Sequence, residues 1–156
     1  MDHRLISVGM LELASYEAPE TGVVGRIVLP WFRKDTTVDV IFELEVASNS
    51  PNDLQVQAFT EFASSKYNIF TQVEKRVWDY YQRSVACHEG SLVISNSQSL
   101  AEKTTLTGCV VGYFDGDDWS AYIGLLAECE WEPEHGLGIK IVDGLISEIG
   151  FQDIIT

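Results

Sequence analysis

The sequence predicts an α+β fold in which antiparallel strands at both ends of the chain flank a long, broken helical segment. Three observations predict it. Apolar and polar residues alternate over residues 38–46, a helix-start signal lies at residues 50–53, and strand and turn signals fill residues 108–156. The 156 residues suffice to bury a core, so we expect a single domain over residues 1–156, with the helical segment packed on one face of the antiparallel sheet or sheets and a C-terminal β-meander.

The N-terminal part, residues 5–46, is predicted to form an antiparallel sheet of about three strands. The clearest strand is residues 38–46, where an apolar face alternates with a mainly acidic one. Residues 5–13 and 23–29 carry weaker strand patterns. We expect the second of these strands to end at Pro30, because proline has no backbone N–H for a ladder hydrogen bond.

The helical segment is predicted over residues 50–87. Ser50 is expected to cap the first helix, with Pro51 in its first turn and Asp53 in the capping-box position. Residues 64–68 weaken helix propensity, which favours two helices or one kinked helix. In the second half, apolar residues recur every three or four positions, which predicts a face packed on the sheet.

The C-terminal part, residues 108–156, is predicted to be a β-meander. Strands are expected over residues 109–114 and 121–132. Asp143 and Gly144 are expected to form a two-residue hairpin turn, since both central residues of that turn need positive φ.

The charge balance excludes several classes of partner. Ten basic against 24 acidic residues give a net charge of −14, which repels nucleic acids and anionic membranes. No apolar run approaches the roughly 18 residues that span a bilayer, and the N-terminus lacks a signal-peptide pattern, so we expect a cytoplasmic protein. The three cysteines are widely spaced and predict reduced thiols that fill the core: Cys87, Cys109 and Cys129. No cofactor is predicted.

Acidic residues are concentrated near the predicted C-terminal strands. Between Lys103 and Lys140 there is no Lys or Arg, whereas seven acidic residues fall there. In a strand over residues 128–132, a period of two directs the glutamates to one face and Cys129 and Trp131 to the other. We expect a carboxylate-lined binding surface with these candidate residues: Glu128, Glu130, Trp131, Glu132, Glu134 and His135.

The C-terminal residues resemble a known pattern. Residues 131–139 read WEPEHGLGI, and Asp143-Gly144 and Ile149-Gly150 follow. This stretch resembles the C-terminal signature of an uncharacterised bacterial domain family, W-[DE]-x-E-H-G-[LIV]-[AG]-[VI], and the likeness extends over residues 38–156. Some relatives lie among bacterial toxin and immunity genes, so the resemblance implies a protein-binding role.

Three functional hypotheses follow. The leading one is a non-enzymatic cytoplasmic interaction protein with a basic protein partner, of which an immunity-type inhibitor of a basic toxin is one form. The alternative is a small hydrolase or metal-dependent enzyme, for which we name these residues: Glu132, Glu134, His135 and either Asp117 or Asp118. A third is a purely structural or ligand-sensing module with a pocket formed beneath three aromatic residues: Trp78, Tyr80 and Tyr81.

The sequence assigns no residue a catalytic or metal-binding role. His3 and His88 are the only other histidines, and the sequence contains no H-E-x-x-H or G-x-S-x-G motif. A structural interpretation is therefore favoured for Glu134 and His135, in which their side chains bond backbone groups of a tight connection while Gly136 supplies an unusual φ.

Overall fold

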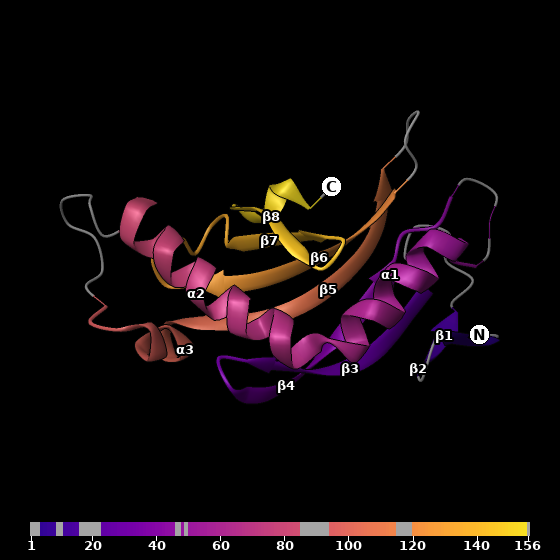
Figure 1. Ribbon diagram of the computed structural model, residues 1–156, viewed down its shortest axis with the longest axis horizontal. Coiled ribbons are helices and arrows are strands. Elements are labelled where there is room, and N and C mark those ends of the chain that lie inside the picture. The colour runs from indigo at the N-terminus through magenta and orange to yellow at the C-terminus, as the bar shows by residue number, and fades with distance from the viewer. Residues whose placement is uncertain are drawn as a thin grey trace.

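The computed structural model describes residues 4–8, 11–15, 23–45, 48, 50–84, 94–114 and 120–155, with side chains described from Gly25 onward. The strands form one sheet in chain order, β1 to β8. Two helices run across one face of this curved sheet (Figure 1). The α+β class and the C-terminal meander are therefore confirmed.

The N-terminal strands differ in their bounds from those predicted. Residues 5–13 do not form one strand, because the chain reverses between β1 (Arg4–Val8) and β2 (Leu11–Ser15). The next strand, β3 (Val23–Trp31), continues through Pro30, which pairs with Asp35. β2 pairs only with the first two residues of β3, so at Pro30 the described chain places no strand on the other side of β3. A missing amide there costs no ladder hydrogen bond.

Strand β4 (Lys34–Phe42) shows the predicted alternation, although it starts and ends four residues earlier than predicted. Val38, Val40 and Phe42 are buried, while Asp39 and Ile41 are exposed. The strand ends early because, after Phe42, the Gln55 side chain of the following helix supplies a hydrogen-bond donor in place of a neighbouring strand. Its side chain donates to the carbonyl of Glu43 at 2.6 Å.

Strands β4 and β5 (Thr104–Phe114) pair in parallel, and all other neighbours pair antiparallel. A parallel pair needs a long crossover, which the helical segment provides. The remaining strands are β6 (Ser120–Cys129), β7 (Leu137–Val142) and β8 (Leu145–Gly150). Asp143 and Gly144 join β7 to β8 with φ of 52° and 75°, as the sequence predicts.

The crossover contains α1 (Asp53–Ser64) and α2 (Lys66–Ser84), then η1 (Ser97–Ser99) and α3 (Leu100–Lys103). The predicted break between two helices is confirmed. The predicted cap at Ser50 is wrong, because Asn52 caps α1. The Asn52 side chain accepts from the Gln55 amide at 2.8 Å, and the Gln55 side chain accepts from the Asn52 amide at 3.0 Å. This reciprocal capping box places Pro51 before the helix.

The core lies between the helices and the sheet. Aromatic residues link the two layers: the ring centroids of Phe42 and Phe59 are 5.4 Å apart, and those of Trp31 and Phe70 are 6.4 Å apart. Trp31 is also fixed by a hydrogen bond from its Nε1 to the Thr104 hydroxyl at 3.0 Å. In the described part of the chain, no helix is both long and apolar enough to cross a membrane.

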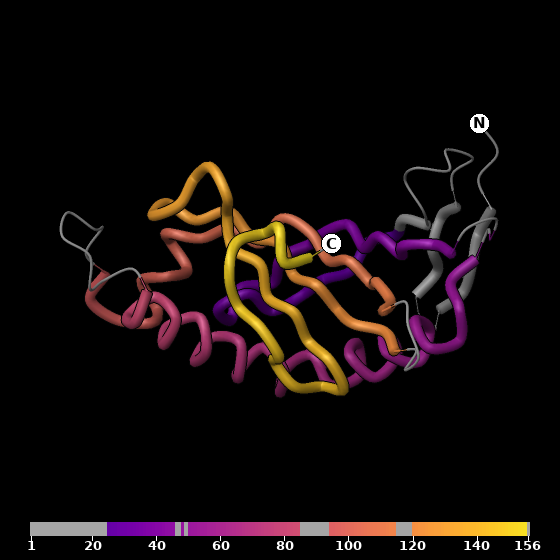
Figure 2. Tube along the Cα trace, turned by 90° about the horizontal axis from the view of Figure 1, so that it is seen from above, coloured from indigo at the N-terminus to yellow at the C-terminus, as the bar shows by residue number. Residues whose placement is uncertain are grey.

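The C-terminal segment packs on the opposite face of the sheet. There η2 (Gln152–Ile154) and Ile155 follow β8 (Figure 2). Ile155 forms a separate apolar cluster with Val110 and Tyr122, and it lies where a side chain on Gly124 would stand. Both faces of the central strands are thus covered.

We predict that Gln55→Leu lowers the free energy of unfolding by about 2–4 kcal/mol. The fully buried Gln55 side chain donates to the carbonyls of Glu43 and Val111, and leucine leaves these buried acceptors without their donor. Urea denaturation measures the change. The matched control is Gln57→Leu, at an exposed position of the same helix, for which we expect a change within about 0.5 kcal/mol. Equal effects of the two substitutions would contradict this role of Gln55.

Candidate functional site

The candidate site is the connection from β6 to β7, residues 130–136. The strand predicted over residues 121–132 ends earlier, at Cys129. The amide of Glu130 bonds the carbonyl of Lys103, and the amide of Glu132 turns back to the carbonyl of Cys129. The predicted carboxylate ladder is therefore wrong beyond Glu128, because the later glutamates lie in turns.

We call the four glutamates Glu128, Glu130, Glu132 and Glu134 the acidic segment. All but Glu132 are exposed, and Glu132 is half-buried. Glu130 forms an ion pair with Lys103 at 3.2 Å. Ion pairs at exposed positions contribute little net stability, so this carboxylate can exchange its partner at small cost.

His135 is held by a carboxylate and a ring. Its Nδ1 lies 2.9 Å from Glu132 Oε1, and its imidazole stacks on Phe151 with the centroids 4.9 Å apart. The predicted side-chain bond from His135 to a backbone group is wrong, because its side chain bonds Glu132 instead. The Glu132 carboxylate accepts from the protonated ring, which raises the pKa of His135 above its usual 6.5.

Gly136 shapes the end of the connection. Its φ is +65°, as the sequence interpretation requires, and its amide donates to the Glu132 carbonyl at 2.9 Å. A Cβ at this position would lie 2.4 Å from Gln152 Nε2 and 2.8 Å from the Ala127 carbonyl. Gln152 Nε2 donates to that carbonyl at 2.8 Å, so η2 fixes the connection against the end of β6.

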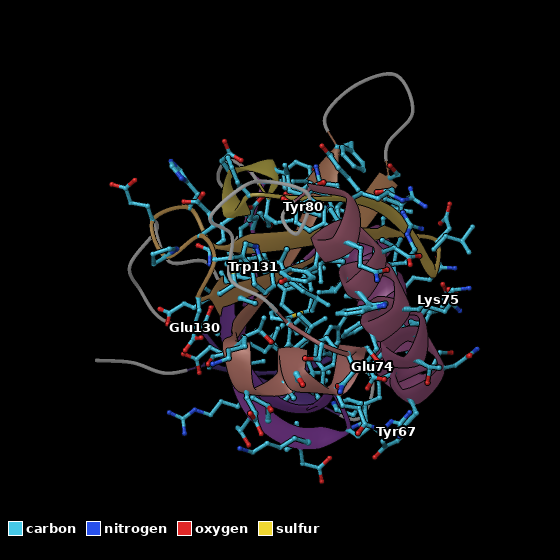
Figure 3. The ribbon with its side chains drawn as sticks, turned by 90° about the vertical axis from the view of Figure 1, so that its left-hand side faces the viewer. Tyr67, Glu74, Lys75, Tyr80, Glu130 and Trp131 are labelled. Atoms are coloured by element: carbon cyan, nitrogen blue, oxygen red, sulfur yellow. The ribbon has the colours of Figure 1, made fainter. Side chains whose placement is uncertain are left out.

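Trp131 anchors the connection to α2. Its ring lies 5.3 Å from that of Tyr81, which in turn stacks on Trp78 at 5.8 Å. Figure 3 shows Trp131 directed inward beside α2, while Glu130 lies at the periphery. Burial raises the pKa of the Tyr80 hydroxyl, and the nearby negative charges of ionised Cys129 and Glu132 raise it further. Of the three aromatic residues predicted to form a pocket, Tyr81 thus packs against Trp131 and Trp78 stacks on Tyr81.

Two of the three cysteines lie among the described residues. Cys109 and Cys129 are buried and free. Burial raises the pKa of the Cys109 thiol to about 12 and that of Cys129 to about 11. Both thiols are therefore protonated at neutral pH and unreactive. Cys87 lies outside the described residues.

The groups named for an enzyme are brought together only in part. Ligand atoms of Glu132, Glu134 and His135 lie within 4.8 Å of one another, so three donors converge. A metal ion there would have to displace the hydrogen bond between Glu132 and His135. Among the described residues, Nε2 of His135 has no hydrogen-bond partner, and no hydroxyl or thiol nucleophile bonds its ring. Asp117 and Asp118, the other residues named for this role, lie outside the described part, as do His3 and His88.

The comparison with known families covers nearly the whole chain. Residues 10–156 match a family described as a domain of unknown function, DUF6985. The chain belongs to the DUF6985 family. The predicted likeness to an uncharacterised domain family is thereby confirmed, and it extends further toward the N-terminus than residue 38. No curated protein and no solved structure gives a significant match to this DUF6985 chain.

We predict that His135 of this DUF6985 domain titrates above its usual pKa of 6.5 and that Glu132→Gln brings the value back toward it. The neutral amide no longer stabilises the imidazolium. Because the folded-state pKa is raised, the pair stabilises the fold fully below pH 6.5, and this contribution is lost as pH rises through the raised pKa. NMR titration of the ring protons measures both values. Glu148→Gln is the control, and an unchanged pKa in Glu132→Gln would contradict the assignment.

A second prediction compares two glycines with positive φ. Gly136→Ala should destabilise the domain by about 2–4 kcal/mol, because it adds a steric clash to the cost of a left-handed residue. Gly144→Ala should cost only about 1–2 kcal/mol, since nothing lies within 4 Å of the added Cβ. Thermal and urea denaturation measure the difference. A larger loss of stability for Gly144→Ala than for Gly136→Ala would show that contacts with Gln152 do not fix the connection.

Proposed function

We propose that this DUF6985 domain is a non-enzymatic protein-interaction module of the bacterial cytoplasm that binds a basic partner through its acidic segment. The observation that carries the proposal is the clustering of four carboxylates at the end of β6 and on the short connection that follows it. Within the described chain, its cationic contacts are Lys103 and the protonated form of His135. The segment therefore presents an excess of negative charge to solvent.

Rigidity of the connection supports binding. Trp131 packs against Tyr81, and Gln152 bonds the carbonyl of Ala127 beside Gly136. Binding to a rigid segment costs less conformational entropy than binding to a segment that must first be ordered. The carboxylates of the acidic segment are thus offered to a partner in a fixed arrangement.

The charge of the whole protein supports a basic partner. With a net charge of −14, the domain attracts cationic proteins over a distance of about one Debye length, roughly 8 Å at physiological salt. Complementary fields speed encounter and select against acidic partners. An immunity-type inhibitor that covers the basic surface of a toxin has this charge pattern, and it is the form of the proposal that the resemblance to toxin-associated relatives favours.

We predict that neutralising the acidic segment abolishes capture of the partner. In the test, the tagged domain is crosslinked in source cells and purified, and bound proteins are identified by mass spectrometry. The test variant carries four substitutions together: Glu128→Gln, Glu130→Gln, Glu132→Gln and Glu134→Gln. The matched control removes the same number of charges at exposed positions elsewhere: Asp35→Asn, Asp39→Asn, Asp53→Asn and Glu148→Gln.

We expect the wild type and the control variant to recover the same basic protein. The test variant should recover at least tenfold less of it. Its recovery should fall as salt rises from about 0.05 M to about 0.5 M, because screening weakens interactions between exposed charges. Equal recovery by both variants, or recovery that is insensitive to salt, would overturn the proposal. The product of the gene immediately upstream is the first protein to look for.

A further inference from the structure

A cleft of about 670 Å³ lies where the junction of α1 and α2 meets the ends of β6 and β7. Figure 2 shows the turn between β7 and β8 beside this junction. The cleft is separate from the acidic segment, because residues from Ser120 to Ile123 of β6 line it, whereas the acidic segment begins at Glu128. The five steps along the strand from Ile123 to Glu128 span roughly 17 Å.

The base of the cleft is apolar. Buried side chains from both layers form it, namely Phe62 and Ile69 of the helices and Ile123 and Ile141 of the strands. Leu54 adds an exposed apolar group at the side. A hydrocarbon body placed here would lose contact with water on several sides at once, which favours binding.

The rim of the cleft is polar and carries charge of one sign. Among the residues that the structure describes, Glu61 and Asp143 are the only charged ones that line the cleft, and none of the lining residues is Lys, Arg or His. The Gln57 side chain donates to Glu61 Oε1 at 3.2 Å, which orients this carboxylate. Asp143 lies in the tight turn between β7 and β8, with φ of 52°. Two exposed acidic residues therefore line a cleft whose base is apolar.

We infer that this cleft binds a small organic cation with an apolar body. An ammonium or guanidinium head would lie near Glu61 and Asp143, and the hydrocarbon would contact Ile123 and Ile141. The volume falls within the roughly 300–1,000 Å³ of sites for whole small molecules and exceeds what one amino-acid side chain would fill. The site does not depend on the proposed binding of a basic protein.

The test is a titration of the ¹⁵N-labelled full-length protein, followed by NMR. The probe is 4-phenylbutylammonium, and its matched analogues are the neutral 4-phenylbutan-1-ol and the anionic 4-phenylbutanoate. We expect saturable shifts of the amides of Ser65, Asn68, Ile123 and Gly144, with at least tenfold weaker binding of the alcohol and no binding of the carboxylate. A probe this small is expected to bind with a dissociation constant of at most about 5 mM. The absence of any saturable shift up to about that concentration of the ammonium compound would therefore overturn the inference.

The variant Glu61→Gln with Asp143→Asn should weaken binding of the ammonium compound at least tenfold. Asparagine keeps the turn because it tolerates positive φ. The control, Asp39→Asn with Glu148→Gln, removes as many charges outside the cleft and should bind as the wild type does. Equal loss in both variants, or shifts that map to the acidic segment, would show attraction by net charge alone and would overturn the site. Equally tight binding of N-acetyl-lysine methylamide would overturn the assignment to a free small molecule.

Discussion

The side chain of Gln55 is the interaction on which the rest of the fold depends. It is fully buried, and its amide joins three segments: the oxygen accepts from Asn52 at the start of α1, and the nitrogen donates to the carbonyls of Glu43 and Val111. These carbonyls lie where the parallel pair of β4 and β5 ends. An unpaired amide or carbonyl is costly in a buried place, so one side chain fixes both the end of the pair and the direction in which the helices leave it.

A second glutamine has a comparable role on the opposite face. Gln152 Nε2 donates to the carbonyl of Ala127, and the Gln152 backbone amide donates to the carbonyl of His135. The last residues of the chain thus hold the connection between β6 and β7, which explains why Gly136 has no room for a side chain. Gln55 positions the helices that form one wall of the cleft, and Gln152 positions the acidic segment. The two candidate binding regions consequently rest on separate contacts.

Local patterns in the sequence predict those features that local chemistry decides. The alternation in β4, the break near Ser65 and the turn at Asp143 and Gly144 are of this kind. Other features depend on contacts between distant residues. Ser50 and Asn52 are equally suitable caps in isolation, and Gln55 decides between them through its contacts with the sheet. The strand β6 ends at Cys129, where the amide of Glu132 turns back to the Cys129 carbonyl. The parallel pairing of β4 and β5 has no local signal.

The sequence predicts both Glu132 and His135 as candidate binding residues, but it does not predict that they bond each other. That contact depends on the turn that brings the two side chains together. The His135 imidazole is exposed, and within the described part of the chain no hydroxyl or thiol bonds its ring. What the pair does change is charge. While His135 is protonated, it offsets one carboxylate of the acidic segment, and the raised pKa extends that state above pH 6.5. Deprotonation then returns a full negative charge to the surface, which would strengthen attraction to the basic partner that we propose.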